Sequence, residues 1–218
     1  MNSQPYLGAR PRVLLKDEVY VQLRDAIVSQ QLSPGTVLKN PEMERWLGVS
    51  RTTIRDALNR LQLAGLVVSA PNRYTRVSEM DASALESISH ALTVLISGLL
   101  MHSANPEARA PELPEVEART DSSACFKAYW AITEAIVSWN DAPALTNIVS
   151  QQFLPLMQRD AVGLRLTPEA IAEFNVAEQG LHDALYRGEN SVAVEMFRQL
   201  THVCMLQTRP TQYLQAVK

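Results

Sequence analysis

The chain has 218 residues, of which 46% are apolar and 20% are charged, and its net charge is −3 at pH 7. This composition is typical of one large or two modest globular domains and excludes a chain that is disordered throughout. The two cysteines, Cys125 and Cys204, lack CxxC spacing, which argues against a disulfide framework or a zinc ribbon and fits a reducing cytoplasm.

Residues 1–15 form an N-terminal arm with a short basic patch and no apolar run of the length found in signal peptides. The longest apolar stretch of the chain, 91–101, is too short to span a bilayer. We therefore expect a cytoplasmic protein that does not interact with a membrane.

A first helix is predicted over 16–30. Val19, Leu23 and Ile27 recur there every four residues and form one apolar stripe. The Leu-Ser-Pro-Gly sequence of 32–35 is typical of a turn and ends the helix.

Two further helices are predicted over 41–47 and 51–64, separated by a tight turn. Gly48 permits a sharp change of chain direction, and Ser50 is a preferred N-cap for the third helix. Gly65 supplies the C-terminal stop of that helix.

The third helix is predicted to be amphipathic. Ile54, Leu58 and Leu61 recur at spacings of four and three and bury one stripe. The polar residues on its other faces are Arg51, Thr52, Arg55 and Asn59.

Two runs of β-branched and aromatic residues, 66–69 and 74–77, are predicted to form a small hairpin. Three helices followed by a hairpin are typical of a winged helix-turn-helix domain, here over 16–78, whose third helix enters the DNA major groove. Residues 1–78 carry eleven Lys and Arg against six Asp and Glu, whereas 79–218 carry nine against seventeen. This asymmetry favours a basic nucleic-acid module joined to an acidic module.

Long helices are predicted throughout 79–218. The first, from 81 to 102, has an apolar stripe made of Leu85, Ile88, Leu92, Leu95 and Leu99. A connection over 103–122, rich in proline and glutamate, follows it. The remaining helices are predicted over 122–139, 143–159, 168–187 and 190–207. The predicted fold is therefore mainly α, with a winged helix-turn-helix followed by an all-α antiparallel bundle.

Residues 16–77 resemble the DNA-binding domain of the GntR family of bacterial transcriptional regulators. The turn at 32–35, the Gly-Val-Ser-Arg-Thr-Thr-Ile-Arg-Asp-Ala-Leu sequence of 48–58 and the stretch from 61 to 67 carry this resemblance. The helical remainder is similar to the FadR-type (FCD) effector domain through its helix pattern, Asn140 and the stretch 184–189. The resemblance implies a dimeric, ligand-responsive regulator of double-stranded operator DNA, and repression is the commoner role in the family.

The resemblance also implies the DNA contacts. Arginine at the start of the reading helix suits guanine O6 and N7, and hydroxyl and N–H groups there suit phosphate. The predicted DNA-binding residues are Arg51, Thr52, Thr53, Arg55, Asn59, Arg73 and Arg45. Pro41 stands where the family usually has a DNA-contacting arginine, so Arg45 or Lys39 is expected to compensate.

The effector domain departs from the metal-binding members of the family. Phe126, Trp130, Glu178 and Gln199 stand where those members have an aspartate and three histidines, and neither aromatic residue can hold a divalent ion. We therefore expect no metal and no cofactor. The aromatic positions favour either an apolar cavity for an organic acid, aromatic or acyl metabolite, or a filled cavity without an effector. The predicted effector-binding residues are Trp130, Glu178, His182, Arg198 and Gln199.

Two alternatives remain open at this point. One is a constitutive DNA-binding regulator whose bundle serves only to form the dimer. The other is a metabolite-binding enzyme that carries a winged helix, although no Ser/His/Asp grouping, phosphate loop or metal-spaced cluster is found and the four histidines lack catalytic spacing. We expect a protein that is not an enzyme.

Overall fold

The computed structural model describes residues 15–70, 73–79, 82–102, 111–140 and 142–206. The chain divides into two compact units, Met1–Glu79 and Met80–Lys218. Helices dominate, and a two-stranded antiparallel sheet follows the third helix, which confirms the predicted fold class. Within the described ranges, no helix combines the length and apolar character needed to cross a membrane. The predicted arm over 1–15 lies outside the described residues except for its last position, where α1 begins.

The first unit begins with helix α1, Leu15–Val28, two residues shorter than predicted at its C-terminal end. Gln30 has a φ of 61°, a left-handed conformation that cannot continue a helix. The predicted stripe is confirmed, because Val19, Leu23 and Ile27 are all buried.

Helices α2, Asn40–Leu47, and α3, Arg51–Leu63, follow the predicted bounds to within one residue. Between them Gly48 adopts φ 66° and ψ 26°, a left-handed geometry in which glycine is not strained. Ser50 caps α3, since its hydroxyl accepts a hydrogen bond from the N–H of Thr53 at 3.4 Å.

The hairpin consists of β1, Val67–Ala70, and β2, Tyr74–Val77. Val67 lies opposite Val77 and Ala70 opposite Tyr74. The segment between α1 and α2 also pairs with β2, which the sequence did not predict. The N–H of Leu38 donates to the carbonyl of Thr75 at 2.8 Å, and the N–H of Val77 donates to that of Thr36 at 2.9 Å.

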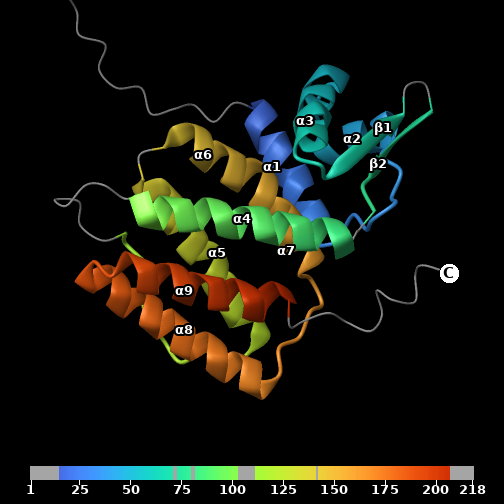
Figure 1. Ribbon diagram of the computed structural model, residues 1–218. Coiled ribbons are helices and arrows are strands. Elements are labelled where there is room, and N and C mark those ends of the chain that lie inside the picture. The colour runs from blue at the N-terminus through green and yellow to red at the C-terminus, as the bar shows by residue number, and fades with distance from the viewer. Residues whose placement is uncertain (1–14, 71–72, 80–81, 103–110, 141, 207–218) are drawn as a thin grey trace, which may run out of the picture. The chain divides into compact units, whose positions relative to one another are not determined.

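The second unit is the predicted helical bundle. Its α-helices are α4 Ala82–His102, α5 Ser122–Trp139, α6 Pro143–Ile148, α7 Leu154–Asp160, α8 Pro168–Arg187 and α9 Asn190–Thr201. Helix α9 packs against both α4 and α8 (Figure 1). Large side chains fill the centre, among them Tyr129, Phe174, Phe197, Ile96 and Leu100, all essentially inaccessible to solvent.

The helix predicted over 143–159 is interrupted by a π-helical turn, η1, at Val149–Phe153. The N–H of Leu154 donates to the carbonyl of Val149, five residues back. Pro155 explains this change, because it has no N–H for the carbonyl four residues earlier and its ring crowds that carbonyl. A second π-helical turn, η2 at His202–Leu206, ends the described part of the chain.

Candidate functional site

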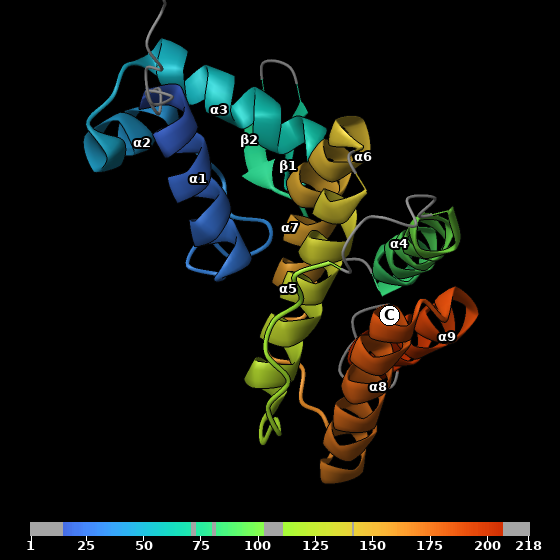
Figure 2. The ribbon, with the colours of Figure 1, turned by 90° about the vertical axis from the view of Figure 1, so that its left-hand side faces the viewer.

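Helix α3 exposes a polar row on one face. Arg51, Arg55 and Asn59 follow one another at intervals of four residues, and all three are exposed. The buried face of α3 contains Ile54, Ala57, Leu58 and Leu61. Helix α3 contacts α1, α2 and β1 within the first unit (Figure 2). The predicted division into a packed and a polar face therefore matches the observed burial.

Arg51 makes an ion pair with helix α2. Its Nε donates to Oε1 of Glu44 at 2.5 Å. The Arg51 side chain is 70% exposed and that of Glu44 30%. Glu44 is not among the residues predicted from the sequence, because its contact with Arg51 joins residues seven positions apart on two different helices.

The first turn of α3 presents backbone N–H groups at the positive end of the helix dipole, a geometry that suits a phosphate. Thr52 is exposed there. Thr53 belongs to the cap, since its hydroxyl lies 3.0 Å from that of Ser50. This engagement leaves Thr52 as the more accessible of the two threonines.

Arg45 and Arg73 are both exposed but lie on different elements. Arg45, on α2, donates from its Nε to the carbonyl of Pro41 at 3.2 Å. Arg73 immediately precedes β2, and its N–H donates to the carbonyl of Ala70 at 3.0 Å. Both residues therefore lie outside α3, the helix that carries Arg51.

In the second unit, Glu178 is tied to Arg119. The carboxylate of Glu178 is fully buried and accepts from Nε of Arg119 at 3.2 Å and from its Nη2 at 2.7 Å. This hydrogen bonding raises the pKa of Arg119. The backbone N–H of Arg119 also donates to the side-chain oxygen of Asn175 at 2.9 Å, so the segment before α5 is fixed on α8.

His182 and Trp130 lie against the interior of the bundle. Nε2 of His182 is buried, and it has no hydrogen-bond partner among the described residues. Burial lowers the pKa of His182, although Glu178 and Asp183 oppose the shift. The ring of Trp130 packs edge-on against Tyr129, with 4.9 Å between the ring centroids.

Arg198 and Gln199 instead line a groove between α4 and α9, with a volume of about 910 Å³. The other lining residues are Glu86, Ser87, Ser89, His90, Thr93, Val94, Glu195, Thr201 and His202. The five predicted effector residues therefore fall in two places, the bundle interior and this groove.

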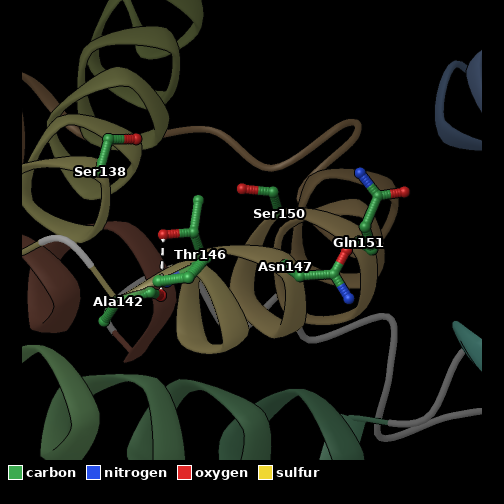
Figure 3. A pocket seen from close by; sticks show the side chains of 7 residues that line it. Ser138, Ala142, Thr146, Asn147, Ser150 and Gln151 are labelled. Atoms are coloured by element: carbon green, nitrogen blue, oxygen red, sulfur yellow. Dashed lines mark hydrogen bonds between the residues drawn. The ribbon is translucent and has the colours of Figure 1, made fainter.

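A smaller pocket of about 420 Å³ lies where α5 ends and α6 and η1 begin (Figure 3). Ser138, Asn147, Ser150 and Gln151 supply uncharged polar groups to it. The hydroxyl of Thr146 donates to the carbonyl of Ala142 at 3.1 Å. In the part of the chain that the structure describes, no group of three or more His, Cys, Asp or Glu side chains is arranged to hold a metal ion.

Comparison with known proteins gives matches to bacterial regulators. Residues 15–77 match the model of the bacterial regulatory proteins of the gntR family. A curated relative, an uncharacterised HTH-type transcriptional regulator in an unstable DNA locus of Streptomyces ambofaciens, is 36% identical over 64 residues. That match spans 29% of this chain and 27% of the relative.

Solved structures resemble the fold over nearly the whole chain. McbR/YncC of E. coli has a TM-score of 0.65 at 19% identity, and the match covers 94% of this chain and all of that one. A GntR protein from Rhodococcus sp. RHA1 has a TM-score of 0.63 at 17% identity, and the match covers 93% of this chain and 99% of that one. At these identities the likeness establishes the fold alone.

Proposed function

We propose that this chain, whose residues 15–77 belong to the GntR family of bacterial regulatory proteins, is a DNA-binding transcriptional regulator and not an enzyme. The observation that supports this most directly is the exposed row of Arg51, Arg55 and Asn59 on a capped helix. Such a helix fits the major groove, where arginine is the commonest side chain that reads guanine.

The DNA contacts divide by their chemistry. Arg51 and Arg55 contact base edges or phosphates, and Asn59 continues the same face. Thr52, Thr53 and the first N–H groups of α3 contact phosphate, which positions the helix without reading sequence. Arg45 and Arg73, exposed on α2 and beside the hairpin, add contacts to the DNA on either side of the reading helix.

The test is selection of binding sites from a pool of random DNA duplexes by the full chain. We expect an enriched sequence and an affinity for it that falls steeply with salt. Arg51→Ala should reduce the preference for the enriched sequence by a factor of about 10 to 100, whereas Arg187→Ala, at an exposed position on α8, should not. Failure to enrich any sequence, or an unchanged preference in Arg51→Ala, would refute this assignment.

The regulator is a homodimer in this proposal, with two copies of α3 facing the two halves of a pseudopalindromic operator. An enriched sequence made of two inverted half-sites is the expected sign of this arrangement. Sedimentation of the complex should give two chains per duplex, and a single chain on a single half-site would contradict the dimer. We assign the protein to the cytoplasm because its target is DNA.

The second unit is an FCD-type domain in this proposal, and it binds a small organic acid that alters operator affinity. In the α4/α9 groove, Arg198, His90 and His202 can donate hydrogen bonds to a carboxylate, whereas Glu86 and Glu195, which line the same groove, oppose an anion. Trp130, His182 and Glu178 form a second candidate place in the interior, where Nε2 of His182 is buried and lacks a hydrogen-bond partner among the described residues. Repression is the expected effect, with the ligand releasing the operator.

A thermal-shift screen of small carboxylates, aromatic acids, acyl compounds and divalent metals tests the effector proposal. Stabilisation by a carboxylate that disappears in Arg198→Ala and persists in Arg187→Ala supports the groove. Loss of stabilisation in His182→Gln instead supports the interior. A screen without any response supports a constitutive regulator whose second unit only forms the dimer.

A further inference from the structure

We infer that Glu44 determines DNA specificity by holding the guanidinium of Arg51 in a fixed orientation and by disfavouring contacts between that guanidinium and phosphate. The inference rests on the proposed function, since it concerns how the reading helix discriminates among sequences.

The geometry of the ion pair is compatible with simultaneous base reading. Glu44 accepts from Nε of Arg51. That hydrogen bond does not involve Nη1 and Nη2, the two nitrogens at the end of the side chain that form a bidentate contact with guanine O6 and N7. A guanidinium is planar, so a hydrogen bond that fixes Nε also limits the plane in which the two terminal nitrogens lie.

Glu44 is a better anchor than a freely exposed glutamate. Its side chain is only 30% exposed. Its backbone carbonyl accepts the N–H of Gly48 at 2.9 Å and so belongs to the turn that connects α2 to α3. An exposed arginine loses rotamer freedom when it docks on a base, and a partner that restricts it beforehand reduces that loss.

The negative charge of Glu44 also favours discrimination between sequences. A carboxylate close to the DNA repels phosphates, so it weakens binding to any sequence. The correct base pair offsets this penalty only when Arg51 makes its bidentate contact. Glu44 therefore weakens binding to random DNA and increases the preference for the correct base. Its removal should strengthen binding to random DNA and reduce that preference.

Glu42 provides a matched control on the same helix. It pairs with Lys39 at 3.1 Å, both side chains are more than half exposed, and the pair does not include the reading helix. Glu42→Gln and Glu44→Gln remove the same charge from positions two residues apart. Only Glu44→Gln removes the ion pair with Arg51.

The experiment measures the affinity of full-length variants for the duplex selected by the wild-type chain, for the same duplex with each guanine replaced, and for a random duplex. For Glu44→Gln we expect binding to the random duplex to strengthen about twofold to threefold. We also expect the preference for one guanine position to fall about fivefold to tenfold. Arg51→Ala should lose its preference at that position, and adding Glu44→Gln to Arg51→Ala should cause no further loss there.

Several outcomes would overturn the inference. Unchanged base preference in Glu44→Gln would refute it, as would an equal loss of preference in Glu42→Gln, because charge alone would then explain the effect. If Glu44→Gln disturbs folding, judged by circular dichroism, Glu44→Asp keeps the charge, shortens the side chain and should still weaken the preference at the same guanine. Failure of the wild-type chain to select any sequence would refute the proposed function itself, which is a different result.

Discussion

The buried ion pair of the second unit gives the sharpest stability prediction. Glu178 is fully buried and the side chain of Arg119 is only 13% exposed. Arg119→Met removes both hydrogen bonds to the carboxylate and leaves it without its cationic partner in a desolvated place. The backbone contacts of Arg119 with Asn175 do not depend on the side chain and should persist.

The expected cost is large, because removing one partner of a buried ion pair costs about 3–5 kcal/mol, much of it the penalty of the stranded charge. We expect about 3 kcal/mol here, the lower end of that range, since the small residual exposure of Arg119 lets water approach the site. The double variant Arg119→Met/Glu178→Met removes both charges and should recover most of the loss, to within about 1 kcal/mol of wild type.

Urea unfolding followed by tryptophan fluorescence provides the measurement. The chain has three tryptophans, and a Trp46→Phe background leaves Trp130 and Trp139, both in the second unit, so the signal does not mix the two units. Arg198→Met, at an exposed position on α9, is the control and should change stability little. A loss below about 1 kcal/mol in Arg119→Met would refute the reasoning, because the pair would then behave like a surface ion pair. So would a double variant no more stable than the single one.

Two further predictions concern pH and the turn before α3. Burial in the folded chain lowers the pKa of His182, so near and below a pH of about 6.5 the unfolded chain binds more protons than the folded chain, and the free energy of unfolding falls as the pH falls. The thermal midpoint should therefore drop less on acidification in His182→Gln than in His90→Gln, the exposed control. Equal drops in the two variants would contradict the assignment. Gly48→Ala should destabilise the first unit by about 1–2 kcal/mol, because alanine is strained at a φ of 66° although nothing blocks its methyl group. Hydrogen exchange of the α3 amides should measure this loss. Gly48→Asn should lose less stability, because asparagine tolerates the left-handed region better than alanine.

Local signals in the sequence predicted most of the fold. Ser50 and Gly48 were sufficient to locate the turn and the start of α3, because a cap hydroxyl and a left-handed residue affect only the backbone within about one helical turn of their own position. Helices α5 and α8 begin and end at the predicted residues, since the N-cap side chains Asp121 and Thr167, and Pro168 at the start of α8, are equally local signals. Apolar periodicity likewise separated the buried face of α3 from its exposed polar face.

Contacts between distant segments were not predictable in the same way. The pairing of 35–38 with β2 and the Arg119–Glu178 ion pair join residues that lie far apart in the sequence. The division of the predicted effector residues between an interior and a groove likewise depends on how α4, α8 and α9 pack.

The residues that α3 presents follow from local sequence, because helical periodicity sets the face on which each side chain lies. The pairing of Arg51 with Glu44 follows instead from how α2 and α3 pack, because an ion pair between two helices depends on their distance and crossing angle. Those quantities are set by packing of the whole first unit and not by any short stretch of chain.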